Sequence, residues 1–458
     1  MLIRTLKSAQ RNLARCWRDR RGNVSLMFGF FAIALAGGVG LAIDTSVAYS
    51  VRSQLSAAVD AAALAGARAF SHPDRDDDIR NFFAANFEDG YMGAVLEPLQ
   101  IVPNEEERTI RVTARANIPT FFMRILGTDF TDIAATGQAT LSSRDVEVSL
   151  VLDVTGSMAG TKIVDLKAAA KELIGIVVQD QQEPFYTKVA LVPYSSAVNV
   201  GSYADDIRGE LTPGTCVYPN EPTCTRFRYR RASNNDWVEY NATTCVTERP
   251  GAQIATDAAP SMALLGPHFE GGNACLDAEI MPLSSDKVAL ELAIDALSTG
   301  GFTAGHLGTA WGWYMISPNF DYLWPAESRP MNYGELHLGR KVLKVVVLMT
   351  DGEFNTFYYD GVVARNAYDS IGPNYRINQN ATHGNSFAQA ESLCDGMKAE
   401  GVEVYTVGFA VGSNSLEANF LRDCATDADH FYLPSSGTDL KQAFRDIATQ
   451  ISNLRLSM

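Results

Sequence analysis

Five oxygen-bearing side chains stand at positions from which they could bind one metal ion. Three of them form a D-x-T-x-S motif, Asp153, Thr155 and Ser157, directly after an apolar stretch. Asp351 follows a second apolar stretch. Thr303 lies between the two apolar stretches in the sequence, after a glycine pair and Phe302. Carboxylates and hydroxyls are hard ligands that suit Mg²⁺, Ca²⁺ or Mn²⁺, whereas zinc and copper prefer nitrogen or sulfur. The five residues predict a divalent-cation site, with Mg²⁺ as the first candidate and Ca²⁺ or Mn²⁺ as alternatives.

Each of these residues also has an ordinary structural explanation. Asp and Ser are preferred helix caps, so Asp153 and Ser157 could cap the helix after the motif, and Thr303 could cap a helix starting near 306. Asp351 could simply close a turn. We favour the metal site because caps and turns do not require these residues to meet, whereas the fold predicted from the rest of the chain brings them to one place.

An alternating pattern of strands and helices, which begins at Val146, must position these residues. Apolar strands are predicted at 146–153, 188–193, 344–350 and 402–409. Helices are predicted at 162–178, 286–297, 306–315, 386–400, 415–425 and 439–454. Continuous apolar strands separated by helices predict a parallel sheet covered on both faces, in which ligands bind at the carboxyl ends of the strands.

The N-terminus carries a different pattern. Residues 1–23 contain seven basic residues against Asp19, a net charge of +6, while the other 435 residues carry −21. Residues 24–43 hold no charge, and a helix of this length spans a hydrocarbon core of about 30 Å. Since Lys and Arg stay on the cytoplasmic side, we predict a basic cytoplasmic head, a single transmembrane helix and an exported remainder. A cleaved signal peptide and a buried core helix are the alternatives.

Residues 44–145 are predicted to form a stalk without chemistry of its own. The membrane helix continues to about residue 70 and is rich in small residues, which offer a surface for oligomerisation through the 24–70 helix. A short helix at 79–87 and alternating strands between 96 and 142 follow, with a helical interruption at 120–126.

The acidic remainder of the chain argues against nucleic acid as a partner.

Six cysteines lie beyond the predicted membrane helix, and Cys16 lies before it. An even number suits three disulfides in an oxidising compartment. Zinc is the alternative, disfavoured because no C-x-x-C pair or closely spaced His cluster accompanies them. Their pairing stays open from sequence. The six are Cys216, Cys224, Cys245, Cys275, Cys394 and Cys424.

The motif and its setting resemble the metal-ion-dependent adhesion site of von Willebrand factor A domains, whose motif is D-x-S-x-S. Asp153, Thr155 and Ser157 match it with Thr in place of the first Ser, and Thr303 and Asp351 match the loop Thr and the second Asp. The resemblance implies an A-type, Rossmann-like α/β fold over residues 146–458, with insertions at about 200–285 and 317–340. It also implies that the two carboxylates reach the ion largely through water, that the hydroxyls supply ligands, and that a partner's carboxylate takes the open position.

The N-terminal segment resembles that of TadG-like proteins of tight-adherence (Flp) pilus systems. The matching features are the Arg-Gly entry, the Gly-rich membrane helix, the Ala-Ile-Asp exit and the closing Ala-Ala-Leu-Ala-Gly-Ala. Residues 303–318 and 424–457 resemble these proteins as well. The resemblance implies a bacterial inner-membrane protein with a periplasmic or extracellular A domain, whose partners are a protein ligand or other pilus-assembly components. The segment lacks the signature of true Flp prepilins, so we expect the anchor to be retained.

Three classes of function remain. The first is a non-enzymatic, membrane-anchored component of pilus assembly or adhesion, and this is our prediction. The second is a metal-dependent hydrolase, for which Glu353 and His306 are the nearest candidates for a general base. The third is a chaperone-like A-domain partner of an ATPase, against which the predicted export argues because ATP is scarce outside the cytoplasm.

Overall fold

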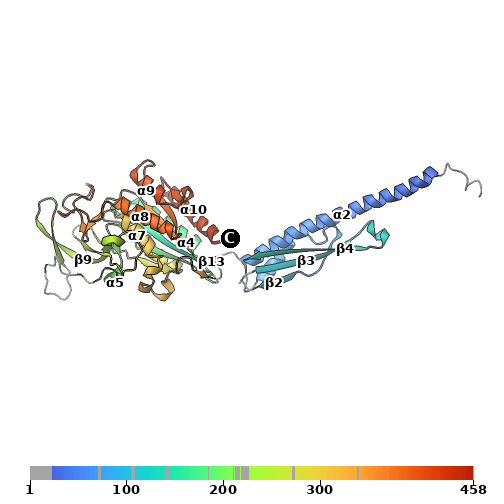
Figure 1. The fold of residues 1–458 in the computed structure, drawn as a ribbon, viewed down its shortest axis with the longest axis horizontal. Helices are drawn as coiled ribbons and strands as arrows, with labels where there is room; N and C mark the ends of the chain where they lie inside the picture. Colours follow the sequence, from blue (N-terminus) through green and yellow to red (C-terminus); the bar gives the residue numbers. More distant parts are fainter. Residues whose placement is uncertain are drawn as a thin grey trace, which may run out of the picture. The chain divides into compact units, whose positions relative to one another are not determined.

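The computed structural model describes residues 23–70, 74–104, 109–140, 144–183, 185–209, 211, 217, 226–270, 274–337, 340–368 and 370–456. The chain divides into two compact units, Met1–Ser142 and Ser143–Met458, which we call the N-terminal unit and the C-terminal unit (Figure 1). Most of the predicted basic head, together with Cys16, Cys216 and Cys224, lies outside the described residues.

A long helix and a four-stranded antiparallel sheet form the N-terminal unit (Figure 1). Helix α2 (Asn23–Arg68) has 46 residues, so the helix predicted to continue from the apolar segment to about residue 70 is observed without a break. Strand β3 is central: β1 and β2 pair with different stretches of it, and β4 pairs along its whole length. The remaining elements are α3 (Arg75–Asn86), η2 (Tyr91–Gly93), β1 (Val95–Leu96), β2 (Gln100–Asn104), β3 (Thr109–Pro119), η3 (Met123–Leu126) and β4 (Phe130–Thr140).

The second half of α2 packs against the sheet of its own unit. Ala58, Ala62 and Ala63 are buried in one cluster with Ile110 and Val112 of β3. Small side chains let the helix backbone approach the sheet closely. The small residues that we expected to offer a surface to another helix therefore contact this sheet.

The first half of α2 is exposed and apolar. Every residue from Met27 to Val39 is exposed. Among the described residues, α2 is the one helix long and apolar enough to cross a membrane, with a mean hydropathy of 1.8.

A six-stranded sheet forms the centre of the C-terminal unit, in the order β11-β6-β5-β14-β17-β18. Counted along the chain, this order is 3-2-1-4-5-6, that of a doubly wound α/β sheet. The four predicted strands, β6, β5, β14 and β17, pair in parallel, as does β18, whereas the edge strand β11 is antiparallel to β6. The predicted parallel sheet is confirmed, and β11 was not predicted. The strands are β5 (Val146–Asp153), β6 (Thr187–Tyr194), β11 (Met281–Ser284), β14 (Leu343–Thr350), β17 (Glu403–Gly408) and β18 (Phe431–Tyr432).

Helices cover both faces of this sheet. Along the parallel strands, alternate residues point into one or the other of two buried clusters, as the pleat of a strand requires. One cluster contains residues of α7, α8 and α9, and the other contains residues of α4, α6 and α10. The helices are α4 (Thr161–Val177), α6 (Lys287–Asp295), α7 (Gly305–Tyr314), α8 (Ser386–Ala399), α9 (Leu416–Cys424) and α10 (Gly437–Leu456), with the short η4 (Gly156–Met158) and η9 (Ala428–His430).

The insertion between β6 and α6 contains a second, antiparallel sheet that the sequence analysis did not predict. Its longest strand, β9 (Trp237–Thr247), pairs with the other three. These are β7 (Val198–Asn199), β8 (Arg226–Arg230) and β10 (Gly266–Glu270), accompanied by η5 (Gly201–Tyr203), α5 (Ala204–Arg208) and η6 (Gly251–Gln253). Further along the chain lie η7 (Pro318–Leu323), η8 (Ala326–Ser328), β12 (Leu336–His337), β13 (Arg340–Lys341), β15 (Tyr358–Tyr359) and β16 (Val362–Val363).

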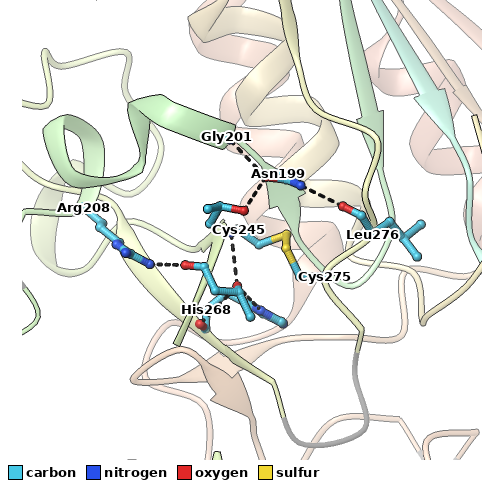
Figure 2. The surroundings of a disulfide bond; sticks show 9 residues. Asn199, Gly201, Arg208, Cys245, His268, Cys275 and Leu276 are labelled. Carbon is cyan, nitrogen blue, oxygen red and sulfur yellow. Dashed lines mark hydrogen bonds between the residues drawn. A yellow bond between two sulfur atoms is a disulfide. The ribbon is translucent and has the colours of Figure 1, made fainter. Parts of the chain in front are cut away.

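Two disulfides are present among the described residues. Cys394–Cys424 joins α8 to α9, and Cys245–Cys275 joins β9 to the segment before β11. Figure 2 shows His268 beside the second bridge, and the ligand atoms of these two cysteines and His268 lie within 4.8 Å of one another. Because the two sulfur atoms are bonded to each other, they offer no thiolate to zinc. The disulfide prediction is confirmed for these four cysteines.

Candidate functional site

The two predicted carboxylates lie where the strand order of the central sheet reverses. Asp153 is the last residue of β5, and Asp351 directly follows β14, the strand paired with β5. In doubly wound sheets, ligands bind in the crevice at this reversal, outside the carboxyl ends of the strands. The fold therefore places both carboxylates where a ligand is expected.

A chain of hydrogen bonds links four of the five predicted residues. The Thr155 hydroxyl donates to Asp153 Oδ1 at 2.6 Å and lies 2.9 Å from Ser157 Oγ. Ser157 Oγ donates to Asp351 Oδ1 at 2.6 Å. Asp153 and Thr155 are fully buried, whereas Ser157 is exposed. The group therefore opens to solvent at Ser157.

The fifth residue, Thr303, is placed by a loop that packs on the motif. Gly156 N donates to Gly301 O at 3.2 Å, and Gly300 N donates to Val154 O at 3.0 Å. Thr303 is buried, and its own amide donates to Asn355 Oδ1 at 3.0 Å. Among the described residues, no hydrogen bond joins the Thr303 hydroxyl to the other four residues. The loop that carries Thr303 therefore packs beside the hydrogen-bonded residues, but the Thr303 side chain is not bonded to them.

The electrostatics of the site disfavour a second negative charge. Burial, followed by repulsion from Asp351, raises the pKa of Asp153 to about 6, although hydrogen bonds from Thr155 and Thr350 act in the opposite direction. The Tyr194 hydroxyl also donates a hydrogen bond to Asp153 at 3.2 Å, and burial raises the pKa of this phenol well above 10. A cation beside the two carboxylates would relieve their repulsion.

One cation of the chain itself already contacts this group. Lys162 Nζ, on the first turn of α4, lies 2.6 Å from Asp351 Oδ2. The Lys162 side chain is about one-third exposed, whereas that of Asp351 is buried. Asp351 therefore has one oxygen bonded to Ser157 and the other to an ammonium group.

The chemistry of the donor set fits a hard divalent cation. The candidate ligands are two carboxylates and three hydroxyls, without nitrogen or sulfur. The buried Asp153 carboxylate, bonded to hydroxyl donors and repelled by Asp351, is the group whose charge a cation would offset most. Ser157 and the hydroxyls behind it would hold such an ion at the exposed edge.

The two candidates for a general base lie in other surroundings. His306 is buried, and its Nε2 lies 3.0 Å from Glu248 Oε1, an oxygen that also accepts the amide of Tyr358. His306 is therefore a paired core histidine. Burial and the charge of Glu417 raise the pKa of Glu353, which lies two residues after Asp351.

Four residues that contact the site were missed in the sequence analysis. Lys162 contacts Asp351, and both Thr350 and Tyr194 donate hydrogen bonds to Asp153. Asn355 accepts the amide of Thr303. Thr350 and Tyr194 end strands whose carboxyl ends were expected to carry the chemistry, and this position was the available signal. Lys162 and Asn355 stand close in sequence to predicted ligands, but nothing in their residue type indicates the direction of their side chains.

Comparison with a family model supports the resemblance of the N-terminal segment. Residues 22–69 match the model described as putative Flp pilus-assembly TadE/G-like. The match covers this segment, and the TadG-like resemblance is confirmed there. No functionally curated protein matches the chain.

Solved structures similar to the chain include pilus proteins, and one of them is a von Willebrand factor domain. The von Willebrand factor domain of the type V pili tip protein Mfa5 from Porphyromonas gingivalis is 15% identical, with a TM-score of 0.37, and the match covers 69% of this chain and 97% of that one. The pilus adhesin SpaC from Lactobacillus rhamnosus GG is 12% identical, with a TM-score of 0.37, over 79% of this chain and 35% of SpaC. The pilus adhesin RrgA from Streptococcus pneumoniae is 12% identical, with a TM-score of 0.36, over 79% of this chain and 49% of RrgA. The chain thus spans about a third of the length of SpaC.

The fold class rests on the sheet itself. The strand order, the helices on both faces and the D-x-T-x-S turn at the reversal define a Rossmann-like α/β unit of the von Willebrand factor A type. This unit follows a long apolar N-terminal helix and a small α+β unit, so the predicted fold class is confirmed.

Proposed function

We propose that Asp153, Thr155, Ser157, Thr303 and Asp351 bind a divalent cation, Mg²⁺ first, with Ca²⁺ or Mn²⁺ as alternatives. The observation that carries this proposal is the hydrogen-bonded chain from Asp153 through Thr155 and Ser157 to Asp351 at the strand-order reversal. Ser157 is exposed, so an ion held there keeps a coordination position open toward solvent. A carboxylate of a protein ligand fits that position, because hard cations prefer oxygen ligands.

The proposed setting is a non-enzymatic component of Flp-type pilus assembly or adhesion in a bacterial inner membrane. The family-model match over residues 22–69 and the exposed apolar half of α2 support it. The basic residues before the helix favour a cytoplasmic N-terminus. The two disulfides of the C-terminal unit suit an oxidising compartment outside the cytoplasm.

The chain is accordingly proposed to have four parts. Residues 1–23 form the cytoplasmic head and residues 24–43 form the membrane span. Residues 44–145 form the stalk, and residues 146–458 form the ligand-binding A domain. Its partners are the membrane, a protein ligand and other pilus-assembly components.

Calorimetric titration of the purified full-length chain in detergent with Mg²⁺ or Mn²⁺ tests the cation site. Ser157→Ala removes the exposed hydroxyl and leaves both carboxylates, so folding should persist. Loss of even an outer contact to a metal ligand costs about 10- to 100-fold in affinity, so we expect Ser157→Ala and Asp351→Asn to bind at least about tenfold more weakly. Asp295→Asn, which alters an exposed carboxylate paired with Lys171, is the matched control and should bind as the parent does.

Thermal unfolding gives a second measurement on the same samples. A cation that binds only the folded state stabilises it by about 2.7 kcal/mol at a hundredfold excess over Kd. The parent and Asp295→Asn should gain this stability, whereas Asp351→Asn, binding at least about tenfold more weakly, should gain about 1.4 kcal/mol or less at the same ion concentration. Equal stabilisation of all variants, or none with any of the three ions, would contradict the cation site.

The pilus assignment has its own test. Deletion of the gene should remove or reduce surface pili and adhesion, and re-expression of the parent chain should restore them. Normal piliation and adhesion in the deletion strain would remove the pilus assignment and leave the cation-site test unaffected.

A further inference from the structure

The turn between β3 and β4 exposes large apolar side chains. In the segment Thr120–Gly127, which contains η3, Phe121 is 66% exposed, Phe122 41% and Ile125 82%. Soluble surfaces rarely gather such side chains in one place without a partner. We call this segment the apolar turn.

The apolar turn lies beside the last turns of the exposed half of α2. A Cβ built on Gly40 would lie 2.5 Å from Phe122 Cγ, so the ring of Phe122 packs directly on the backbone of the helix at this glycine. Gly40 lies within the uncharged segment of α2, about 6 Å before Asp44 at 1.5 Å per residue. The ring of Phe122 therefore lies at a level of the helix that is still apolar on its other sides.

Asp44 fixes the turn at this level. Its Oδ1 accepts the amide of Phe121 at 3.0 Å, and its Oδ2 accepts those of Phe122 and Met123 at 2.9 and 2.7 Å. Asp44 is itself buried, although it is the first charged residue after the apolar segment. Backbone N–H groups without partners are costly near hydrocarbon, and this carboxylate satisfies three of them.

The charged groups of the turn do not oppose contact with lipid. Arg124 Nε lies 3.1 Å from Asp129 Oδ1, and both side chains are exposed. A long Arg side chain can keep its charged end in the headgroup region while its stem covers apolar surface. The turn thus combines exposed apolar side chains, three backbone amides that are hydrogen-bonded to Asp44, and an arginine paired with a carboxylate.

We propose that the apolar turn inserts into the lipid bilayer at the surface where α2 leaves it, with Phe121, Phe122 and Ile125 facing the boundary between acyl chains and headgroups. The inference rests on the proposed membrane span, because continuity with the exposed apolar half of α2 identifies lipid as the occupant. The N-terminal unit is then held to the membrane at two points, the helix and the turn. Interfacial segments with apolar side chains bury to about 5–10 Å in this way.

The test uses the full-length chain reconstituted in phosphatidylcholine–phosphatidylglycerol vesicles. An environment-sensitive dye is attached to Ile125→Cys in a background with Cys16→Ser, Cys216→Ser and Cys224→Ser, and quenching by lipids with a shallow spin label is measured. The matched control is Val102→Cys, because Val102 is also an exposed apolar residue, 57% exposed, in the same unit. Val102 pairs with Arg111, eight residues along β3 from Pro119, which is about 27 Å from the turn at 3.4 Å per residue.

We expect blue-shifted emission and quenching several-fold stronger at position 125 than at position 102. Adding Asp44→Ala, which releases the three amides, should lower quenching at position 125 toward that of the control. Flotation of the vesicles reports the membrane span separately. If the protein does not float with the vesicles, the proposed anchor fails. If it floats while the dye at position 125 stays in water, the inserted turn is refuted and the apolar surface belongs to a protein partner.

Discussion

Lys162 and the proposed cation would share one carboxylate. The ammonium lies 2.6 Å from Asp351 Oδ2, so its charge repels any divalent ion held at Ser157. A repulsion of about 1.4 kcal/mol, modest for a partly exposed site, corresponds to tenfold in affinity. We expect Lys162→Met to bind Mg²⁺ or Mn²⁺ up to about tenfold more tightly in calorimetric titration.

The control for this variant is Lys167→Met, on the same helix, where Lys167 bonds the carbonyl of Asp295. This variant should leave cation affinity unchanged. Weaker binding by Lys162→Met would show that Lys162 orients Asp351 for the ion and does not compete with it.

At the opposite end of the sheet lies a buried ion pair, in which each charge is compensated by the other. Lys344 Nζ lies 2.5 Å from Glu147 Oε2, and Glu147 also accepts the Tyr186 hydroxyl and the Met331 amide. Burial lowers the pKa of Lys344, while the charge of Glu147 opposes this shift.

Removing one partner of a buried pair leaves an uncompensated charge and costs about 3–5 kcal/mol. We expect Lys344→Met to lose this much stability in chemical denaturation, and Lys344→Met with Glu147→Gln to recover part of it. Exposed Lys341→Met should change stability by less than about 0.5 kcal/mol. A Lys344→Met variant as stable as the parent would contradict the expected dependence.

Residue types at strand ends allowed the candidate ligands to be predicted, but not their closest neighbours. Asp153 ends one apolar strand and Asp351 follows another, and the general geometry of such sheets brings them together. Lys162 and Asn355 reach the site only through side-chain directions that depend on the packing of α4 and of the segment after β14. Such directions leave no periodic signal in the sequence.

At the scale of elements, the close approach of α2 to β4 depends on Gly137. A Cβ there would lie 2.7 Å from Asp60 Oδ1 and 3.0 Å from the backbone oxygen of Val59. Overpacking against a backbone atom typically costs about 1–3 kcal/mol. We expect Gly137→Ala to lower the unfolding midpoint of the N-terminal unit by about 4–8 °C per kcal/mol, measured by scanning calorimetry of the full chain.

The matched control is Gly38→Ala, because no atom lies within 4 Å of a Cβ at Gly38. This variant should leave the midpoint unchanged or slightly raised, since Ala favours helix over Gly. If Gly137→Ala unfolds at the same temperature as Gly38→Ala, the expected steric clash between a Cβ at position 137 and α2 is contradicted.

Long apolar or strongly periodic elements were predicted, whereas the insertion was not. Strands such as β14 are continuous apolar runs, and α10 alternates at helical spacing. In the insertion, β7 has only two residues, whereas β8 reads RFRYR, a polar–apolar alternation that indicates a strand and that was not used in the prediction. The edge strand β11 reads MPLS and contains a proline, which removes one backbone donor, so only its contact with β6 defines it as a strand.

At the scale of the molecule, both described disulfides lie in the C-terminal unit. Cys394 and Cys424 are 30 residues apart, and a bridge over such a loop stabilises by about 2–4 kcal/mol. Because the chain forms two compact units, we expect two calorimetric transitions. Cys394→Ala with Cys424→Ala should lower the transition of the C-terminal unit and leave that of the N-terminal unit in place.

Cys16→Ser is the control, and it should change neither transition. A shift of both transitions in the double variant would show that the two units unfold together, contrary to their separate hydrophobic clusters.

The uninterrupted helix α2 has a mechanical consequence. Its 46 residues extend over about 69 Å at 1.5 Å per residue, and they include no proline between the apolar half and the half that packs on the sheet. A hinge at this point would let the sheet rotate freely relative to the apolar half. Without one, a sideways force on the sheet is transmitted along the helix to its apolar half, and in the proposed membrane span this force would change the tilt of the helix in the bilayer.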